Sequence, residues 1–151
     1  MEERIRNLVE KDRIVECINR LFVGTDDRDW KAVRAYFADA VRFDMTSLSG
    51  GEPAVLTPRQ ITHAWEAGLR PLHAIHHQAG NFLVEVGDGT AKAFCYATAS
   101  HYRKTASGRD TRTFVGSYDF ELEKKDDRWL ITMFRFNLKY LDGNLDLDTA
   151  D

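Results

Sequence analysis

The stretch "IVECINRLFVGTDDRDW", residues 14–30, decides where the first helix ends and which of its acids faces inward. Its apolar side chains recur at spacings of three and four residues, which is the stripe of an amphipathic helix with one buried face. Counting on by fours from Ile14 through Phe22 reaches Asp26, so a helix of that length carries Asp26 on the buried stripe. Gly24 could instead end the helix early, which would make Asp26 an ordinary connector acid. The pattern alone leaves both alternatives open.

The segments that follow carry helix-start signals. Asp27 is expected to turn toward solvent, whereas Asp29 directly precedes a second predicted helix, whose free N–H groups its side chain can accept. Thr57 and Gln60 form a capping box with a proline between them, which predicts a third helix. The residues that this third helix is expected to bury are Ile61, Trp65 and Leu69.

The rest of the chain is strand-like. Alternating apolar residues predict a strand over 41–45. Segments 74–86 and 90–104 flank the turn "GDG" as one hairpin, and segments 111–124 and 128–140 flank "KDD" as a second. This order predicts a single α+β domain, with helices packed on one face of a curved, mainly antiparallel sheet.

Composition narrows the class of protein. A chain of 151 residues with 43% hydrophobic residues and a net charge of −3 fits one globular domain and gives no electrostatic case for nucleic acid. We expect no membrane span, no signal peptide and a cytoplasmic location. Cys17 and Cys95 are expected to be buried free thiols. We place the domain at 1–142 and expect the acidic tail, 143–151, to be loosely ordered.

Several polar side chains stand on strand faces that are otherwise small or apolar. His101 ends a row of small side chains, His77 lies between Ile75 and Ala79 on the preceding strand, and Arg135 shares the face of apolar residues on the last strand. If these faces meet Asp26, one cavity holds a carboxylate, two imidazoles and a guanidinium. The residues expected to line this pocket are Phe22, Met45, Trp65, Ile75, Ala97, Ala99, Trp129 and Met133.

Such a set suits proton transfer, because a neutral imidazole is a base near physiological pH and a carboxylate on its other nitrogen fixes the tautomer. Each residue also has a plainer interpretation: His77 as a core histidine, His101 as an exposed strand end, and Arg135 as the partner of a surface acid. The run "HAIHH" does not predict a metal site, because adjacent strand residues point to opposite faces. We therefore expect neither a metal nor another cofactor.

Three segments of the chain resemble the SnoaL-like group of the nuclear transport factor 2-like superfamily. These segments are "RIVECINRLFVGTDDRDWKAVRAYFADAVRFDM", "HHQAGNFLVEVGDGTAKAFCY" and "DDRWLITMF", and the most specific element is the D-x-x-D-W after the first helix. The resemblance implies a cone-shaped, cystatin-like α+β barrel, in which helices and a strongly curved sheet enclose a pocket. It also implies that the first helix reaches Asp26.

Enzymes of this group, among them scytalone dehydratase and hexachlorocyclohexane dehydrochlorinase, use an aspartate–histidine pair that falls on Asp26 and His77 here. The resemblance further assigns a second histidine to His101 and a cation to the position of Arg135. Specificity groups of these enzymes are absent: Thr25 and Met45 replace two tyrosines of the dehydratase, and a lysine and a cysteine of the dehydrochlorinase are also replaced. The substrates of those two enzymes are therefore not expected.

Two functions remain open on the sequence. The first is a cofactor-independent lyase or isomerase, dehydratase- or cyclase-like, in which Asp26 and His77 abstract a proton from a small apolar carbonyl compound. The second is a non-catalytic domain that binds a small apolar metabolite and in which the Asp26–His77 pair is structural. A homo-oligomer, dimer or trimer, is expected through aromatic residues of the outer sheet face. The residues assigned to that face are Phe94, Tyr96, Tyr102, Phe114, Tyr118 and Phe120.

Overall fold

The computed structural model describes residues 1–150. The elements in chain order are α1 Glu2–Asp26, α2 Trp30–Arg34, β1 Phe37–Asp44, α3 Thr46–Ser49, β2 Ala54–Leu56, α4 Pro58–Leu69, β3 Ala74–Val86, β4 Thr90–Tyr102, β5 Thr111–Lys125, β6 Arg128–Gly143 and the short 3-10 helix η1 Leu147–Thr149.

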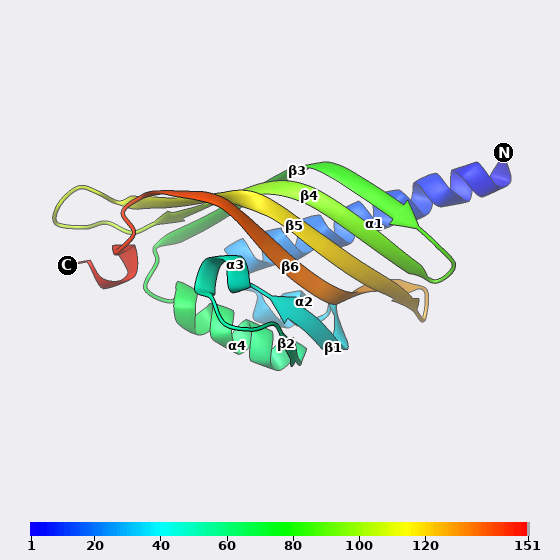
Figure 1. Cartoon of the computed structure of the whole chain (residues 1–151), viewed down its shortest axis with the longest axis horizontal. Helices are drawn as coiled ribbons and strands as arrows, with labels where there is room; N and C mark the ends of the chain where they lie inside the picture. The colour runs from blue at the N-terminus through cyan, green and yellow to red at the C-terminus, as the bar shows by residue number, and fades with distance from the viewer. Residues whose placement is uncertain (151) are drawn as a thin grey trace.

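The strands form one sheet in the order β2-β1-β6-β5-β4-β3, in which only the β1–β6 pair is parallel. The four long strands curve over α1, which packs mainly against β3, while α2 and α4 lie on the same side near β1 (Figure 1). The predicted α+β class, with helices on one face of a curved and mainly antiparallel sheet, is confirmed. Across the described part of the chain, none of the helices combines the length and apolar character that a membrane crossing requires.

Helix α1 runs without interruption to Asp26, so Gly24 does not end it. Ile18 and Leu21 are fully buried, and burial of each such side chain contributes about 2 kcal/mol to folding. Gly24 lies against α2, where an added Cβ would be 3.1 Å from the Cγ2 atom of Val33. The glycine therefore permits a close approach of two helices, and Asp26 stays on the buried stripe.

The predicted caps are present. The Asp29 carboxylate accepts the backbone N–H of Ala32 at 3.1 Å and begins α2. In α4, Thr57 Oγ1 accepts the N–H of Gln60 and Gln60 Oε1 accepts the N–H of Thr57. Because these bonds satisfy groups that a helix start leaves free, they set where α2 and α4 begin. Helix α3 and strand β2 lie between β1 and α4, in a segment for which the sequence pattern predicts neither a helix nor a strand.

A bulge in β6 corrects the predicted face of that strand. Leu122 of β5 pairs with Ile131, whereas the neighbouring Glu121 pairs with Met133, so Thr132 is an extra residue on β6. An extra residue exchanges the inner and outer positions that follow it, and in β6 this exchange holds as far as Leu138, after which a second register shift leaves Lys139 as another extra residue. Ile131 is accordingly buried, but Met133 and Arg135 lie on the outer face, and Phe134 and Phe136 turn inward.

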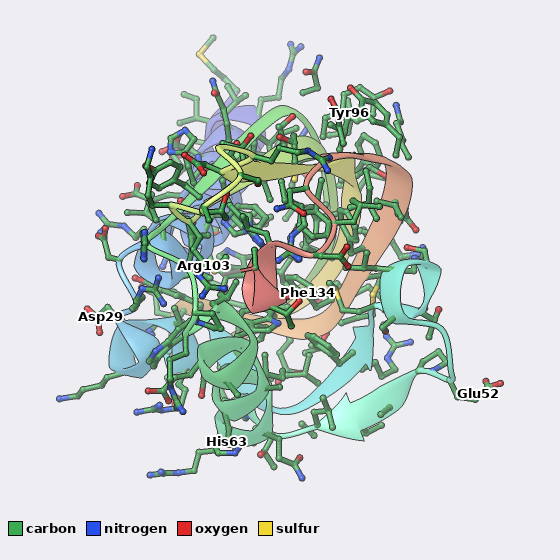
Figure 2. All side chains as sticks on the ribbon, turned by 90° about the vertical axis from the view of Figure 1, so that its left-hand side faces the viewer. Asp29, Glu52, His63, Tyr96, Arg103 and Phe134 are labelled. Carbon is green, nitrogen blue, oxygen red and sulfur yellow. The ribbon has the colours of Figure 1, made fainter. Side chains whose placement is uncertain are left out.

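The outer aromatic surface is smaller than predicted. Tyr118 and Phe120 are buried, and Phe114 faces inward with them, because they pair directly with inward-facing residues of β4. Directly paired residues share a sheet face. Of the aromatic residues assigned to the outer face, Phe94, Tyr96 and Tyr102 remain there, and Tyr96 lies at the periphery in Figure 2. The homo-oligomer stays a prediction, which now depends on these three aromatic residues of the outer face.

The C-terminal segment also differs from the prediction. Strand β6 continues to Gly143, and Leu147 is fully buried against Leu72 and Ile75. Residues 143–150 therefore pack onto the domain instead of forming a loose tail after residue 142; Asp151 lies outside the described residues. The two cysteines are free and buried, as predicted.

Candidate functional site

A cavity of about 220 Å³ opens between α1, α4 and the inner face of the sheet. Its walls are mostly apolar and rich in aromatic rings, among them that of Phe134, which is buried and lies near the middle of the view in Figure 2. Of the predicted pocket residues, Phe22, Met45, Trp65 and Ala99 line it. The other lining residues are Thr25, Leu48, Ala64, Gly68, Leu69, His77, His101, Phe114, Tyr118, Phe134 and Phe136.

Asp26, the last residue of α1, holds His77 of β3 by two hydrogen bonds. Its Oδ1 atom is 2.6 Å from His77 Nδ1, and its Oδ2 atom accepts the backbone N–H of His77 at 2.8 Å. Because a carboxylate only accepts, Nδ1 carries the proton in the neutral form of His77, and Nε2 has the free lone pair in that form. Phe22 stacks on the imidazole at 5.2 Å between ring centroids. The pair therefore fixes the orientation of the imidazole at the cavity wall, with Nε2 as the acceptor nitrogen of its neutral form.

His101 lines the same cavity with the opposite hydrogen-bonding character. Its Nδ1 atom lies 3.0 Å from Nη2 of Arg112, which pairs through two nitrogens with the carboxylate of Asp148. A guanidinium only donates, so His101 Nδ1 accepts and Nε2 carries the proton. Burial first, and then the charges of Arg112 and His77, lower the pKa of His101 to about 4. His101 is therefore a neutral hydrogen-bond donor at physiological pH.

The cavity thus contains an acceptor nitrogen on His77 and a donor N–H on His101. Tyr118 adds a hydroxyl to the wall, and burial raises the pKa of Tyr118, so this hydroxyl stays uncharged. The Thr25 hydroxyl donates its hydrogen bond to the backbone carbonyl of Leu21 at 2.8 Å, so its proton is used within α1 and not directed at the cavity. A base opposite neutral donors can take a proton from carbon and stabilise the charge left on an adjacent oxygen.

The unfolding free energy is expected to fall on acidification because folding opposes protonation of His101. An unfolded histidine titrates near pH 6.5 and His101 near 4, so the unfolded chain takes up the proton first between those values. Each pKa unit corresponds to about 1.4 kcal/mol, so this loss is on the order of 3 kcal/mol below pH 4. Urea denaturation at pH 7 and pH 4.5 should show a smaller loss in His101→Gln; equal losses would contradict this account.

Arg135 does not belong to the cavity. It lies beyond the β6 bulge on the outer face, where its Nη2 atom is 3.0 Å from Asp119 Oδ2 and 46% of its side chain is exposed. Met133 is on the same outer surface. The predicted guanidinium in the pocket is therefore wrong, because one inserted residue exchanged the strand's faces.

Three more predicted pocket residues lie elsewhere. Trp129 donates its indole N–H to Glu10 at 2.5 Å, at a distance from the cavity along the sheet. Ile75 packs with Leu72 and Leu147, and Ala97 belongs to the buried core. The predicted strand faces of Ile75 and Ala97 are correct, but the cavity occupies only part of the inner surface.

The histidine run does not assemble a metal site. His76 is exposed on the face opposite His77, and His73 Nδ1 accepts the backbone N–H of Lys104 at 3.1 Å. Within residues 1–150, no three His, Cys, Asp or Glu side chains lie close enough together to hold a metal ion.

Arg112, Tyr118 and Phe134 reach the site but were not predicted there. The register of the β4–β5 pair would have found two of them, because His101 pairs with Arg112 and Cys95 with Tyr118. Directly paired residues share a face, so this register alone places both residues beside the inward row of β4. No local signal identifies Phe134, since its inward position depends on the bulge.

Comparisons with known proteins agree with this architecture. The Kfla4162 protein from Kribbella flavida is 22% identical with a TM-score of 0.89, and the match covers 95% of this chain and 99% of that chain. A putative scytalone dehydratase from Novosphingobium aromaticivorans is 16% identical with a TM-score of 0.80, and the match covers 91% of this chain and 89% of that chain. Hexachlorocyclohexane dehydrochlorinase LinA-type3 from Novosphingobium barchaimii is 14% identical with a TM-score of 0.78, and the match covers 94% of each chain. No curated protein matches the chain.

At these identities the likeness establishes the fold and not the activity. Sequence comparison with protein families gives the stronger result, because the SnoaL-like domain matches residues 6–135, which is most of the chain. The chain therefore belongs to the SnoaL-like family, with the fold of the nuclear transport factor 2-like superfamily.

Proposed function

We propose that the cavity is an active site in which His77 abstracts a proton from a carbon next to a carbonyl group, as the first step of an elimination or isomerisation. The observation that carries this proposal is the pair of hydrogen bonds that the Asp26 carboxylate accepts from His77, which makes Nε2 the acceptor nitrogen of the neutral ring at the cavity wall. Asp26 orients the ring and stabilises the imidazolium that forms. His101 donates its Nε2–H to the carbonyl oxygen.

The step balances without a cofactor. The C–H bond breaks, its proton passes to His77 Nε2, and its electron pair moves onto the carbonyl oxygen as an enolate. In an isomerase the proton returns to another carbon of the same molecule. In a lyase the carbonyl group re-forms, the electron pair of the enolate makes a double bond between the deprotonated carbon and its neighbour, and the leaving group on that neighbour departs with the electrons of its own bond. Both outcomes use the same acceptor and donor, so the geometry supports the shared first step.

The walls favour an uncharged ring compound. They include the rings of Trp65, Phe134 and Phe136, and within residues 1–150 no lysine or arginine lines the cavity, so a substrate carboxylate or phosphate would lack a counter-charge. The volume of about 220 Å³ exceeds the roughly 150 Å³ of an apolar cavity that holds benzene. A small carbonyl compound of one or two rings fits these limits.

Two of the similar structures, a hexachlorocyclohexane dehydrochlorinase and a putative scytalone dehydratase, are named for elimination reactions. Their low identity to this chain transfers neither substrate nor mechanism. They support the proposal only in that a cavity of this architecture accommodates loss of a small leaving group.

Deuterium incorporation tests the shared first step without knowledge of the natural substrate. The probe is 2-tetralone, an uncharged two-ring ketone with acidic C–H bonds, incubated with the protein in D₂O and followed by proton NMR. Incorporation beside the carbonyl is expected to exceed that in buffer containing an equal concentration of imidazole. A tetralone bearing a carboxylate should exchange at the buffer rate. An equal rate for 2-tetralone with wild-type protein and with buffer would contradict the proposal.

A further inference from the structure

We infer that Arg112 is a positioning residue that holds His101 as the donor of the site, and that Asp148 of the C-terminal segment holds Arg112 in place. The inference rests on the proposed function, because it assigns a purpose to the donor used there. Its basis is the chain of contacts from the Asp148 carboxylate through the Arg112 guanidinium to His101 Nδ1.

Arg112 is an unusual side chain to find at this depth. It is only 9% exposed, its Nε atom is buried without a partner, and its guanidinium carbon lies 5.2 Å from the centre of the Phe114 ring. A buried arginine with an unsatisfied nitrogen costs folding free energy. Its Nη atoms are nevertheless directed to two partners, Asp148 and His101. The guanidinium is therefore placed to fix His101, although its own Nε atom is left without a hydrogen-bond partner.

The two imidazoles of the cavity are distinguished by the charge placed on the same ring atom. His77 Nδ1 faces a carboxylate, which makes the opposite nitrogen an acceptor. His101 Nδ1 faces a guanidinium, which makes the opposite nitrogen a donor and opposes protonation of the ring. Without Arg112, two similar histidines would line one cavity, and either could take the proton. The opposite charges of Asp26 and Arg112 therefore make His77 the base and His101 the donor.

The anchor of Arg112 comes from beyond the part of the chain that matches the family. Asp148 lies thirteen residues after Arg135, where that match ends. Leu147 is fully buried, and Arg103 donates to the carbonyl oxygens of Leu147 at 3.0 Å and Asp148 at 2.8 Å. Figure 2 shows Arg103 beside the C-terminal turn. The packed segment thus contributes a charge to the site instead of trailing from it.

Titration of His101 by NMR gives a test that needs no substrate. Its signal is identified by its loss in His101→Gln and followed with pH in wild type, Arg112→Met, Asp148→Asn and the control Arg135→Met. The control removes an arginine that also pairs with an aspartate, but on the outer face. The charged and titratable groups that face His101 are Arg112 of β5, Asp148 of the C-terminal segment, His77 of β3 and Asp26 of α1.

Arg112→Met should raise the pKa of His101 by at least about one unit from about 4, because a cation is lost and the Asp148 carboxylate remains. Asp148→Asn should raise it by less than Arg112→Met does, because a carboxylate that favours protonation is lost while the charge of Arg112 is kept, although Arg112 is no longer held in place. Arg135→Met should leave the titration unchanged. If Arg112→Met does not fold, Arg112→Lys replaces it in the experiment. Lysine keeps the positive charge but cannot bind Asp148 and His101 with separate nitrogens as the guanidinium does. We therefore expect the pKa of His101 to stay low in Arg112→Lys and its kcat to lie between those of wild type and the other variants.

Exchange of 2-tetralone supplies the second measurement. Arg112→Met and Asp148→Asn should each lower kcat roughly tenfold with KM little changed, less than the 10²- to 10³-fold loss seen when a donor is removed outright. An unchanged His101 titration in Arg112→Met, or equal loss of kcat in Arg112→Met and Arg135→Met, would overturn the inference. Failure of the proposed function gives a different result. The wild-type protein would then exchange 2-tetralone no faster than buffer, regardless of the pKa measured for His101.

Discussion

Replacement of His77 by alanine is expected to slow exchange of 2-tetralone by at least about a hundredfold, because a positioned general base typically contributes 10²- to 10⁴-fold to a rate. The alanine variant removes the imidazole ring that Asp26 orients at the cavity wall. The initial rate of deuterium incorporation, measured at saturating ketone, gives the effect on the proton-transfer step itself.

Two further variants separate the roles within the pair. Asp26→Asn keeps a side-chain oxygen that can accept from His77 Nδ1 but removes the charge that stabilises the imidazolium, so a loss smaller than that of His77→Ala is expected. His63→Ala removes an exposed histidine of α4, which points away from the molecule in Figure 2, and should match wild type.

Substitutions of His77 by glutamine and by alanine distinguish a catalytic protein from a protein that only binds its ligand. If the protein is a binding domain, His77→Gln should retain affinity for 2-tetralone and wild type should show no exchange above buffer. If wild type exchanges and His77→Ala retains that rate, the Asp26–His77 contact is structural and His77 is not the base. Isothermal titration calorimetry with 2-tetralone supplies the affinities alongside the rates.

Replacement of Gly116 by alanine is expected to lower the unfolding free energy by about 3 kcal/mol, at the upper end of the usual cost of overpacking. Gly116 stands in β5 where the register with β6 shifts. An added Cβ would overlap the backbone oxygen of Asn137 and lie 2.9 Å from two ring atoms of Phe136. The backbone cannot move away without breaking the β5–β6 pairing, and Phe136 cannot move without entering the cavity. For a domain of this size the melting temperature should fall by about 6–12 °C.

Gly68→Ala provides the matched control because it adds the same methyl group with the opposite expected result. Gly68 lies inside α4, and an added Cβ would meet nothing within 4 Å. Alanine is favoured over glycine by about 0.8–1 kcal/mol in a helix interior and by less in the last turn, where Gly68 stands, so this variant should be at least as stable as wild type. Urea denaturation followed by circular dichroism measures both variants, and equal unfolding free energies would show that the space around Gly116 does not limit the sheet.

The sequence by itself determined the features that depend on neighbouring residues. The periodicity from Ile14 to Asp26, the caps at Asp29 and Thr57, and the two hairpins each arise from contacts within a few residues, and all are present in the structure. Inward placement of His77 and His101 followed from the period of two along each strand, because no bulge separates them from their predicted inner neighbours.

Only the tertiary structure decided which guanidinium joins the histidines. The sequence favoured Arg135, but the extra residue at Thr132 exchanges the faces of β6 and turns Arg135 outward. Arg112 takes that place through the register of β4 with β5 and through Asp148, a residue 36 positions further along the chain. A bulge and a register are set by the sum of pairings over whole strands, so a shift of one residue reverses every later side chain, and no local pattern records it.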